Sequence, residues 1–295
     1  MSAAEAELVP TRPAAGIVSP RPKRRRLSTR LLRSELRIIA GRRRNQAGLV
    51  VLAAVPIVMA IAVRMSTPRA GEGPDFLSSI TSNGLFVPLA ALSVEIVMFL
   101  PLAMSMLSGD AIAGEASLGT LRYLLTVPVN RTRLLLVKFA SLCIGAVWGV
   151  FAVALPGAAI GIALFGTGPM TTLSGTQIGF GEALWRVVLV MLYLSAGLAG
   201  LAAVGLFIST LTEVPIAAAI ALMVFTIVSW ILDSVPQLGW LHPWLLVDHW
   251  LAFGDLLRDP MAGGEIGRGL FTAAGYAAVF WLAAWARFAG KDITS

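Results

Sequence analysis

The sequence predicts an all-α integral membrane protein with six transmembrane helices, and three observations lead to this prediction. Hydrophobic residues make up 57% of the 295 residues and charged residues only 13%, whereas soluble domains average about 25% charged residues. Six apolar stretches are each long enough to cross a bilayer, which takes about 20 helical residues. Finally, 18 of the 23 Lys and Arg residues fall on one side if both termini are cytoplasmic, as the positive-inside rule requires.

The residues before the first apolar stretch divide into two segments. Residues 1–27 contain four prolines and the basic run Lys23–Arg26, which predicts a disordered arm that lies on anionic membrane lipid. A nucleic-acid partner is not expected, because such a basic run beside several membrane spans fits lipid better. Residues 28–46 place Leu and Ile at helical spacing with Arg around them, so we expect an amphipathic helix in the membrane interface.

The remainder, residues 47–295, is expected to form one six-span domain. The predicted spans are Ala47–Val63, Leu85–Leu107, Leu134–Phe165, Trp185–Leu211, Val214–Leu232 and Leu270–Phe288. The third stretch exceeds one straight crossing, so we expect it to begin as cytoplasmic helix before Lys138. Only Thr212 and Glu213 join the fourth and fifth spans, with Pro215 just beyond, which predicts a tight helical hairpin.

A long extracellular segment, residues 233–267, precedes the last span. Its part Leu241–Leu257 is apolar enough to enter the membrane, but Pro243, Asp248 and Asp255 interrupt it. Charged side chains at membrane depth are costly unless they are paired. We therefore expect re-entrant or interfacial helices here, not a seventh span.

No catalytic or metal site is predicted on this chain. The nearest sequence to a Walker loop, Gly109–Gly114, lacks the Lys and Ser/Thr that hold phosphate and magnesium. His242 and His249 are the only histidines, and they are either a pair of metal ligands or two ordinary interfacial histidines. The second interpretation is favoured, because Pro243 interrupts helical geometry between them. Cys143 is the single cysteine, so no disulfide within the chain is possible.

Glu95 is the one clear carboxylate expected near the middle of a span. A charge at the bilayer centre costs a few kcal/mol and normally faces a cavity or a partner. Two interpretations remain open: Glu95 lines a transport pathway or carries a proton, or it is a protonated carboxyl bonded to a neighbouring helix. Pro88 and Pro101 lie on either side of it and are expected to bend the span.

The loop between the second and third spans carries the most specific pattern in the sequence. Leu121, Leu124 and Leu125 fall on one side of a short helix that Pro128 ends. A helix of this length is not stable alone in water. Its apolar side therefore needs a surface to pack against.

This loop resembles the first cytoplasmic loop of type-2 ABC exporter permeases. The matching positions are Glu115, Gly119, Thr120, Leu121, Leu124, Leu125, Pro128, Val129, Arg131 and Lys138. In that family the loop forms a coupling helix that docks on a separate ATPase subunit. The N-terminal interfacial helix and the extracellular helices before the last span are also similar to those of the family.

The resemblance implies a function, partners and a location. The chain would be the non-catalytic permease subunit of an exporter of drugs, peptides, lipids or ions in a bacterial-type cell membrane. ATP and Mg²⁺ would bind the ATPase, and a second permease copy, identical or different, would complete the transporter. The alternative is an ATP-independent secondary transporter or channel, which predicts internal repeats and discontinuous spans. The sequence has no convincing repeat.

Overall fold

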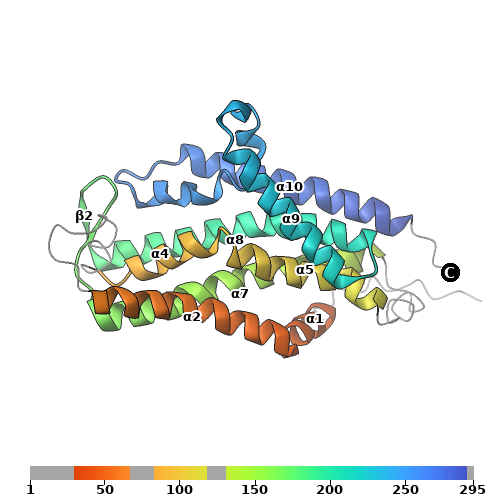
Figure 1. Cartoon of the computed structure of the whole chain (residues 1–295), viewed down its shortest axis with the longest axis horizontal. Helices are drawn as coiled ribbons and strands as arrows, with labels where there is room; N and C mark the ends of the chain where they lie inside the picture. Colours follow the sequence, from red (N-terminus) through yellow and green to blue (C-terminus); the bar gives the residue numbers. More distant parts are fainter. Residues whose placement is uncertain (1–29, 67–82, 118–130, 291–295) are drawn as a thin grey trace, which may run out of the picture.

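The computed structural model describes residues 30–66, 83–117 and 131–290 of the chain. Long helices lie side by side along the longest axis of the molecule (Figure 1). The elements in chain order are α1 (Arg30–Gly41), α2 (Arg43–Ser66), α4 (Phe86–Glu95), α5 (Phe99–Ser117), α7 (Arg131–Phe165), β1 (Met170–Thr171), β2 (Gln177–Ile178), α8 (Phe180–Leu211), α9 (Pro215–Asp233), the 3₁₀ helices η1 (Pro236–Leu238), η2 (His242–Trp244) and η3 (Trp250–Leu257), and α10 (Gly264–Ala289).

Five helices are long and apolar enough to cross a membrane: α2, α7, α8, α9 and α10. Each contains nearly all of one predicted span, and α7 begins at Arg131, before Lys138, as expected. Pro215 is the first residue of α9, four residues after α8 ends, so the predicted hairpin is present. The described chain is therefore mostly helical and carries the apolar helices of a multi-pass membrane protein.

The second predicted span is divided into two helices. α4 ends at Glu95 and α5 begins at Phe99, and the two are bent by 58°. The bend was expected from Pro88 and Pro101, but the sequence did not predict the loss of helix between them. Pro101 has no N–H to donate to the carbonyl of Val97, four residues earlier, so regular helix fails at this point. The pair counts as a sixth span only if the bent helices are taken together.

The N-terminal helix is confirmed over residues 30–41, but the predicted segment 28–46 is not one helix. α1 ends at Gly41 and α2 begins at Arg43, earlier than the predicted start of the first span. Two side chains of α2 stabilise this break: the Asn45 amide donates to the Ile39 carbonyl and the Gln46 amide to the Ala40 carbonyl, both at 2.9 Å. They satisfy carbonyls that the end of a helix leaves without partners.

Glycine allows the turn just before α4 to touch α7 through the backbone. A Cβ atom on Gly161 would lie 2.1 Å from the carbonyl oxygen of Gly84, far inside van der Waals contact. Small residues permit such close packing of membrane helices. This contact holds the N-terminal end of the broken span against α7.

The segment before the last helix, which was expected to be extracellular, forms short helices as predicted, although they are 3₁₀ helices. η3 packs against α8 and α10, and the Trp250 side chain is buried there. The structure also contains a two-stranded antiparallel hairpin, β1–β2, which the all-α prediction did not include. The N–H of Leu173 in its turn donates to the Leu257 carbonyl at 3.0 Å. The hairpin and η3 therefore form one continuous structure at the same end of the bundle.

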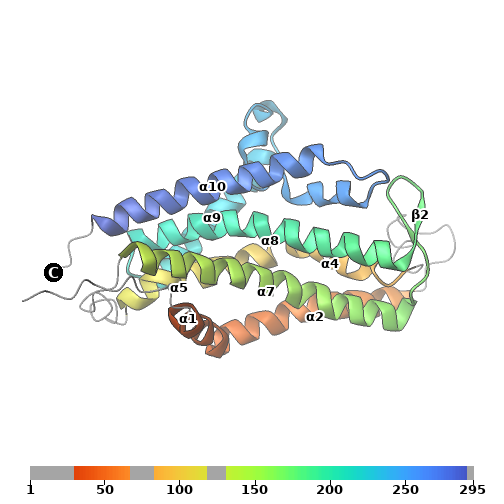
Figure 2. The ribbon, with the colours of Figure 1, turned by 180° about the vertical axis from the view of Figure 1, so that it is seen from behind.

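The helix order places the elements that flank residues 118–130 beside the N-terminal helix. The start of α2, the end of α5, the start of α7 and the end of α10 lie toward one end of the bundle, and the β hairpin lies at the other (Figure 2). Arg42, Arg133 and Arg287 belong to the first end. We predict that this end faces the cytoplasm.

Cysteine labelling in intact cells tests that orientation. In a Cys143→Ala background, Gln177→Cys in β2 should react with a membrane-impermeant thiol reagent, whereas Ser117→Cys should react only after permeabilisation. Both side chains are exposed in the structure, so accessibility within the fold does not limit either reaction. Labelling of the Ser117→Cys variant in intact cells, with no labelling of Gln177→Cys, would show that the protein has the opposite orientation.

Candidate functional site

A buried lysine joins three helices next to the loop that sequence analysis singled out. The Lys138 ammonium of α7 lies 2.9 Å from Glu35 Oε2 of α1 and also contacts the Glu115 carboxylate of α5. The three side chains are only 5%, 11% and 15% exposed, respectively. We call these residues the Lys138 cluster. An ammonium in so apolar a helix needs such partners, because its desolvation is otherwise uncompensated.

A second ion-pair group lies beside the first. Asp110 of α5 accepts from Arg42, between α1 and α2, and from Arg44 in the first turn of α2. Both arginines contact the same oxygen, Oδ2. Bonds between ionised groups are about twice as strong as neutral ones. The junction of α1 and α2 is thus bound to the C-terminal half of α5.

The two groups line a small cleft of about 30 Å³ between α1, α5 and α7. Two neutral polar side chains, Asn45 and Ser141, and several apolar ones also line it. The Ser141 hydroxyl donates a hydrogen bond to the Lys138 carbonyl at 2.7 Å. The cleft is therefore an ion-paired joint between helices, with little room for a ligand.

The start of α7 is also tied to the end of α10. The Arg131 guanidinium donates to the Phe288 carbonyl at 3.4 Å, and the Trp285 indole N–H donates to the Thr132 hydroxyl at 2.9 Å. Arg131 was predicted as a coupling residue from the sequence. In the structure it connects the C-terminal end of the 118–130 loop to the last helix.

Of the other predicted coupling residues, only Glu115 is described, and it contacts Lys138. The rest lie outside the described residues: Gly119, Thr120, Leu121, Leu124, Leu125 and Pro128. Their role as a dock stays a prediction. The structure adds the attachment of both flanks of this loop to the helices around it.

Glu95 lies at the break of the second span. It is the last residue of α4, its side chain is fully buried, and neither carboxylate oxygen has a hydrogen-bond partner within the described residues. The described helices therefore do not supply the bond that the second interpretation of Glu95 required. A buried polar group without a partner costs about 1–3 kcal/mol or more, and such a cost calls for a functional reason.

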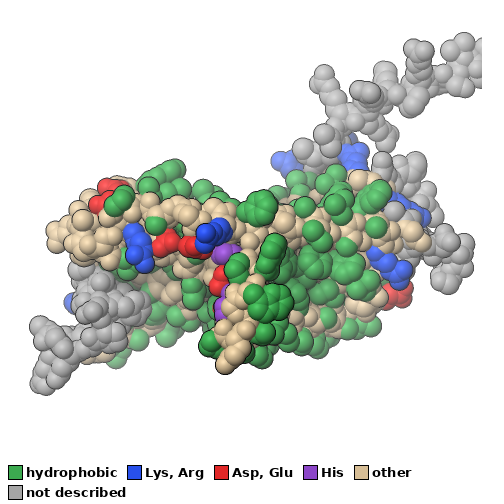
Figure 3. All heavy atoms as spheres, turned by 90° about the horizontal axis from the view of Figure 1, so that it is seen from above, with side chains coloured by type: hydrophobic (Ala, Val, Ile, Leu, Met, Phe, Trp, Pro, Cys, Tyr) green, Lys and Arg blue, Asp and Glu red, His purple; other side chains and the backbone are tan. Residues whose placement is uncertain are grey.

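The two histidines make separate, local hydrogen bonds. Nε2 of His242 lies 3.2 Å from the Val235 carbonyl oxygen, and Nε2 of His249 lies 3.2 Å from that of Pro243. Figure 3 shows histidine beside acidic and basic side chains on a face that also carries many hydrophobic ones. Within the described ranges, no group of three or more His, Cys, Asp or Glu side chains is placed to hold a metal ion. These bonds fit the interpretation as interfacial histidines.

Sequence reasoning missed four members of the ion-pair groups: Glu35, Arg42, Arg44 and Asp110. A signal for one pair was present. Glu35 is the only acidic residue in 28–46, and Lys138 is the only charged residue in the apolar stretch 134–165. Each isolated charge in an apolar surrounding needs a partner of opposite sign. The sequence therefore allowed a contact between Glu35 and Lys138, but it did not exclude other partners for either residue.

Comparison with known proteins gives one family. A family profile described as "Protein of unknown function (DUF2705)" matches residues 54–294. No curated protein matches the chain. The matched range contains Glu95, Asp110, Glu115 and Lys138, and it begins after Glu35 and the two arginines. Because the match covers well over half of the sequence, the chain belongs to the DUF2705 family.

Proposed function

We propose that this chain is the membrane-spanning permease subunit of an ATP-driven ABC exporter. The loop of residues 118–130 docks on a separate ATPase subunit, which binds ATP and Mg²⁺, and two permease copies form the pathway. Both termini face the cytoplasm of a bacterial-type cell. The chain itself catalyses no reaction.

The observation that carries this proposal is the Lys138 cluster. A docking loop moves membrane helices only if its two ends are rigidly joined to them. Glu115, just before the loop, and Lys138, just after it, contact each other and the interfacial helix α1 through Glu35. A force on the loop would therefore act on α1, α5 and α7 as one body. An unspecialised connection between two spans has no need of such a buried joint.

Replacing Leu121 and Leu124 together by Asp tests the dock. Burial of one leucine contributes about 1.5–3 kcal/mol, so the double variant should weaken ATPase binding about 100-fold or more. The ATPase to use is the product of a neighbouring reading frame with Walker and ABC signature motifs. The measurements are pull-down of this ATPase with the permease in detergent and the ATP turnover of the complex.

Ser117→Asp is the matched control, because it adds a charge at an exposed position of α5 just before the loop. It should leave pull-down and turnover unchanged. Undiminished pull-down in the Leu121→Asp, Leu124→Asp variant would show that this loop is not the docking site. The ABC permease proposal would then lose its main support.

A second candidate function, an ATP-independent secondary transporter, is favoured by one observation. Discontinuous spans with polar groups at the break are typical of ion-coupled transporters, and α4–α5 is broken beside the buried Glu95. This function predicts proton or ion flux in vesicles that contain the permease alone. The ABC proposal predicts no such flux without the ATPase and ATP.

A further inference from the structure

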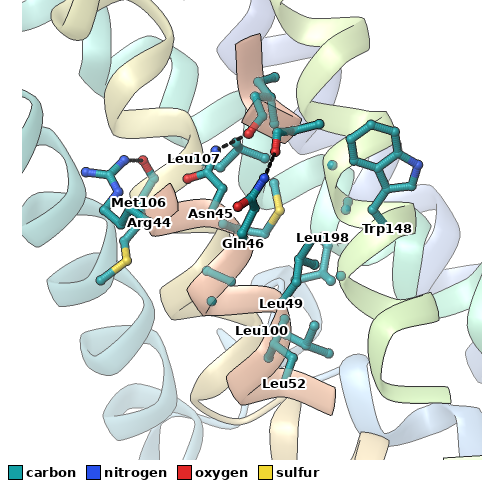
Figure 4. A pocket seen from close by; sticks show the side chains of 18 residues that line it. Arg44, Asn45, Gln46, Leu49, Leu52, Leu100, Met106, Leu107, Trp148 and Leu198 are labelled. Atoms are coloured by element: carbon teal, nitrogen blue, oxygen red, sulfur yellow. Dashed lines mark hydrogen bonds between the residues drawn. The ribbon is translucent and has the colours of Figure 1, made fainter. Parts of the chain in front are cut away.

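A partly open apolar cavity lies between α2, α5 and α7, beside the Asp110 ion pairs. Its volume is about 80 Å³, room for roughly six water-sized groups. Figure 4 shows Leu49, Leu52, Leu100 and Leu198 along one part of the cavity and Arg44, Asn45 and Gln46 near the other. We call it the α2–α7 cavity. It is apolar inside and polar at one end, the arrangement that a lipid requires.

The α2–α7 cavity opens on the outside of the helix bundle. Two of its lining side chains, Met106 of α5 and Trp148 of α7, are 40% and 38% exposed. Val50 and Val51, next to lining residues of α2, are 68% and 51% exposed. In a membrane-spanning helix, such apolar exposure faces the hydrocarbon. The occupant therefore enters sideways from the membrane.

The depth of the cavity matches one leaflet. Its lining on α2 runs from Arg44 to Leu52, about 12 Å along a helix at 1.5 Å per residue. The hydrocarbon core is about 30 Å thick. With α1 in the membrane interface, the cavity reaches the acyl region of the cytoplasmic leaflet and stops short of the midplane.

The charges at the polar end favour an anionic headgroup. Arg42 and Arg44 share the single carboxylate of Asp110, and Arg42 also faces the two carboxylates of the Lys138 cluster across the adjoining cleft, so Arg44 is the cation of this group that faces the cavity. The Arg44 side chain is 46% exposed and lines the cavity. The amide N–H groups of Asn45 and Gln46 are already bonded to α1 carbonyls. Arg44 uses its Nη2 for Asp110 and for the Met106 carbonyl, so its remaining guanidinium N–H groups are the donors to a phosphate.

We propose that the α2–α7 cavity binds one acyl chain of an anionic phospholipid of the cytoplasmic leaflet, with the lipid phosphate at Arg44. The proposal rests on the membrane orientation given above but not on an ATPase partner. The cavity of about 80 Å³ is too small to enclose a whole lipid, so it would hold part of the acyl chain while the rest of the lipid stays in the leaflet. The bound lipid would stabilise the junction of α1 and α2, where the Asp110 ion pairs begin.

Filling the cavity tests the acyl site. Gly48 lines it, and an added Cβ there meets no atom within 4 Å, so Gly48→Ala fits without a clash, and Gly48→Val and Gly48→Leu add increasing volume from the same position. Gly275→Leu in α10 is the control, since its Cβ also meets open space but does not line the cavity. The protein is placed in mixed micelles with phosphatidylglycerol or phosphatidylcholine of equal chain length. Native mass spectrometry then counts the lipid molecules that each protein retains.

We expect the wild-type permease to retain phosphatidylglycerol, with retention falling along the Gly48 series by about tenfold at Leu, the loss of about two buried methylene groups. Gly275→Leu should retain lipid like the wild type. Full retention in Gly48→Leu would overturn the site. A change in the permease oligomer with lipid retention unaltered would also overturn it, because the cavity would then be a contact between copies.

Arg44→Gln and Arg42→Gln test the headgroup site as a matched pair. Each removes one contact to the same Asp110 oxygen, but only Arg44 lines the cavity. Arg44→Gln should lower the preference for phosphatidylglycerol over phosphatidylcholine about fivefold, since one arginine near an anionic lipid contributes about 1 kcal/mol. Arg42→Gln should keep the preference. Equal retention of the two lipids by the wild type would overturn the preference for an anionic headgroup.

Discussion

Lys138→Met is expected to lower the free energy of unfolding by about 3–5 kcal/mol, the usual cost of removing one partner from a buried ion pair. The substitution keeps the length and apolar stem of the side chain, but it removes the ammonium that contacts both Glu35 and Glu115. Two buried carboxylates would then face each other across α1 and α5. The measurement is thermal unfolding of the purified protein in detergent.

The triple variant Glu35→Gln, Glu115→Gln, Lys138→Met separates charge from packing. It removes both carboxylates along with the ammonium, and neutral replacement of a buried ion group is often tolerated. Most of the lost stability should therefore return. The ABC proposal further predicts that ATP turnover of the complex is lowered in Lys138→Met and is not restored in the triple variant, because both lack the ionic joint between the flanks of the loop. An unchanged melting temperature in Lys138→Met would show that the cluster does not hold the helices together.

Glu95→Leu is expected to stabilise the fold by about 1–3 kcal/mol while it abolishes transport. The Glu95 carboxyl is fully buried and has no hydrogen-bond partner within the described residues. Removal of an unsatisfied buried polar group in favour of an apolar one of similar size is stabilising. The loss of transport is expected because we propose that Glu95 lines the transport route, as its burial at the break of the span, without a partner among the described residues, suggests.

Glu95→Gln distinguishes the kinds of function that Glu95 can have. It keeps the size of the side chain but cannot release a proton, so a proton-linked role predicts loss of transport or of its pH dependence. The measurements are thermal unfolding and transport in vesicles at several pH values, with Glu265→Gln on the exposed start of α10 as control. Normal transport by both Glu95 variants at every pH would exclude a pathway or proton role.

The same vesicles separate the two candidate functions. If Glu95→Gln removes a proton flux that the permease carries alone, the protein is a secondary transporter. If flux is absent without the ATPase, and the variant lowers only ATP-driven transport, the ABC proposal is supported. The assay of proton flux needs no knowledge of the cargo.

Local properties of the sequence determined which segments are membrane helices. The length of each apolar stretch predicted the helices α2, α7, α8, α9 and α10, and the spacing of Leu and Arg predicted α1. Pro88 and Pro101 indicated a bend. These features depend on neighbours within a few residues, because hydrophobic length, helical periodicity and the missing proline N–H all act along one segment.

Only the tertiary structure decided which helices meet and which charges pair. Lys138 contacts Glu35, which is 103 residues away in the sequence, and the several arginines near Glu35 were equally plausible partners. The contact of Gly84 with Gly161 is of the same kind. The periodicity of a helix shows which side is apolar, but a membrane helix is apolar on nearly every side. Its neighbours are therefore selected by close packing and buried charge, which are properties of the assembled bundle.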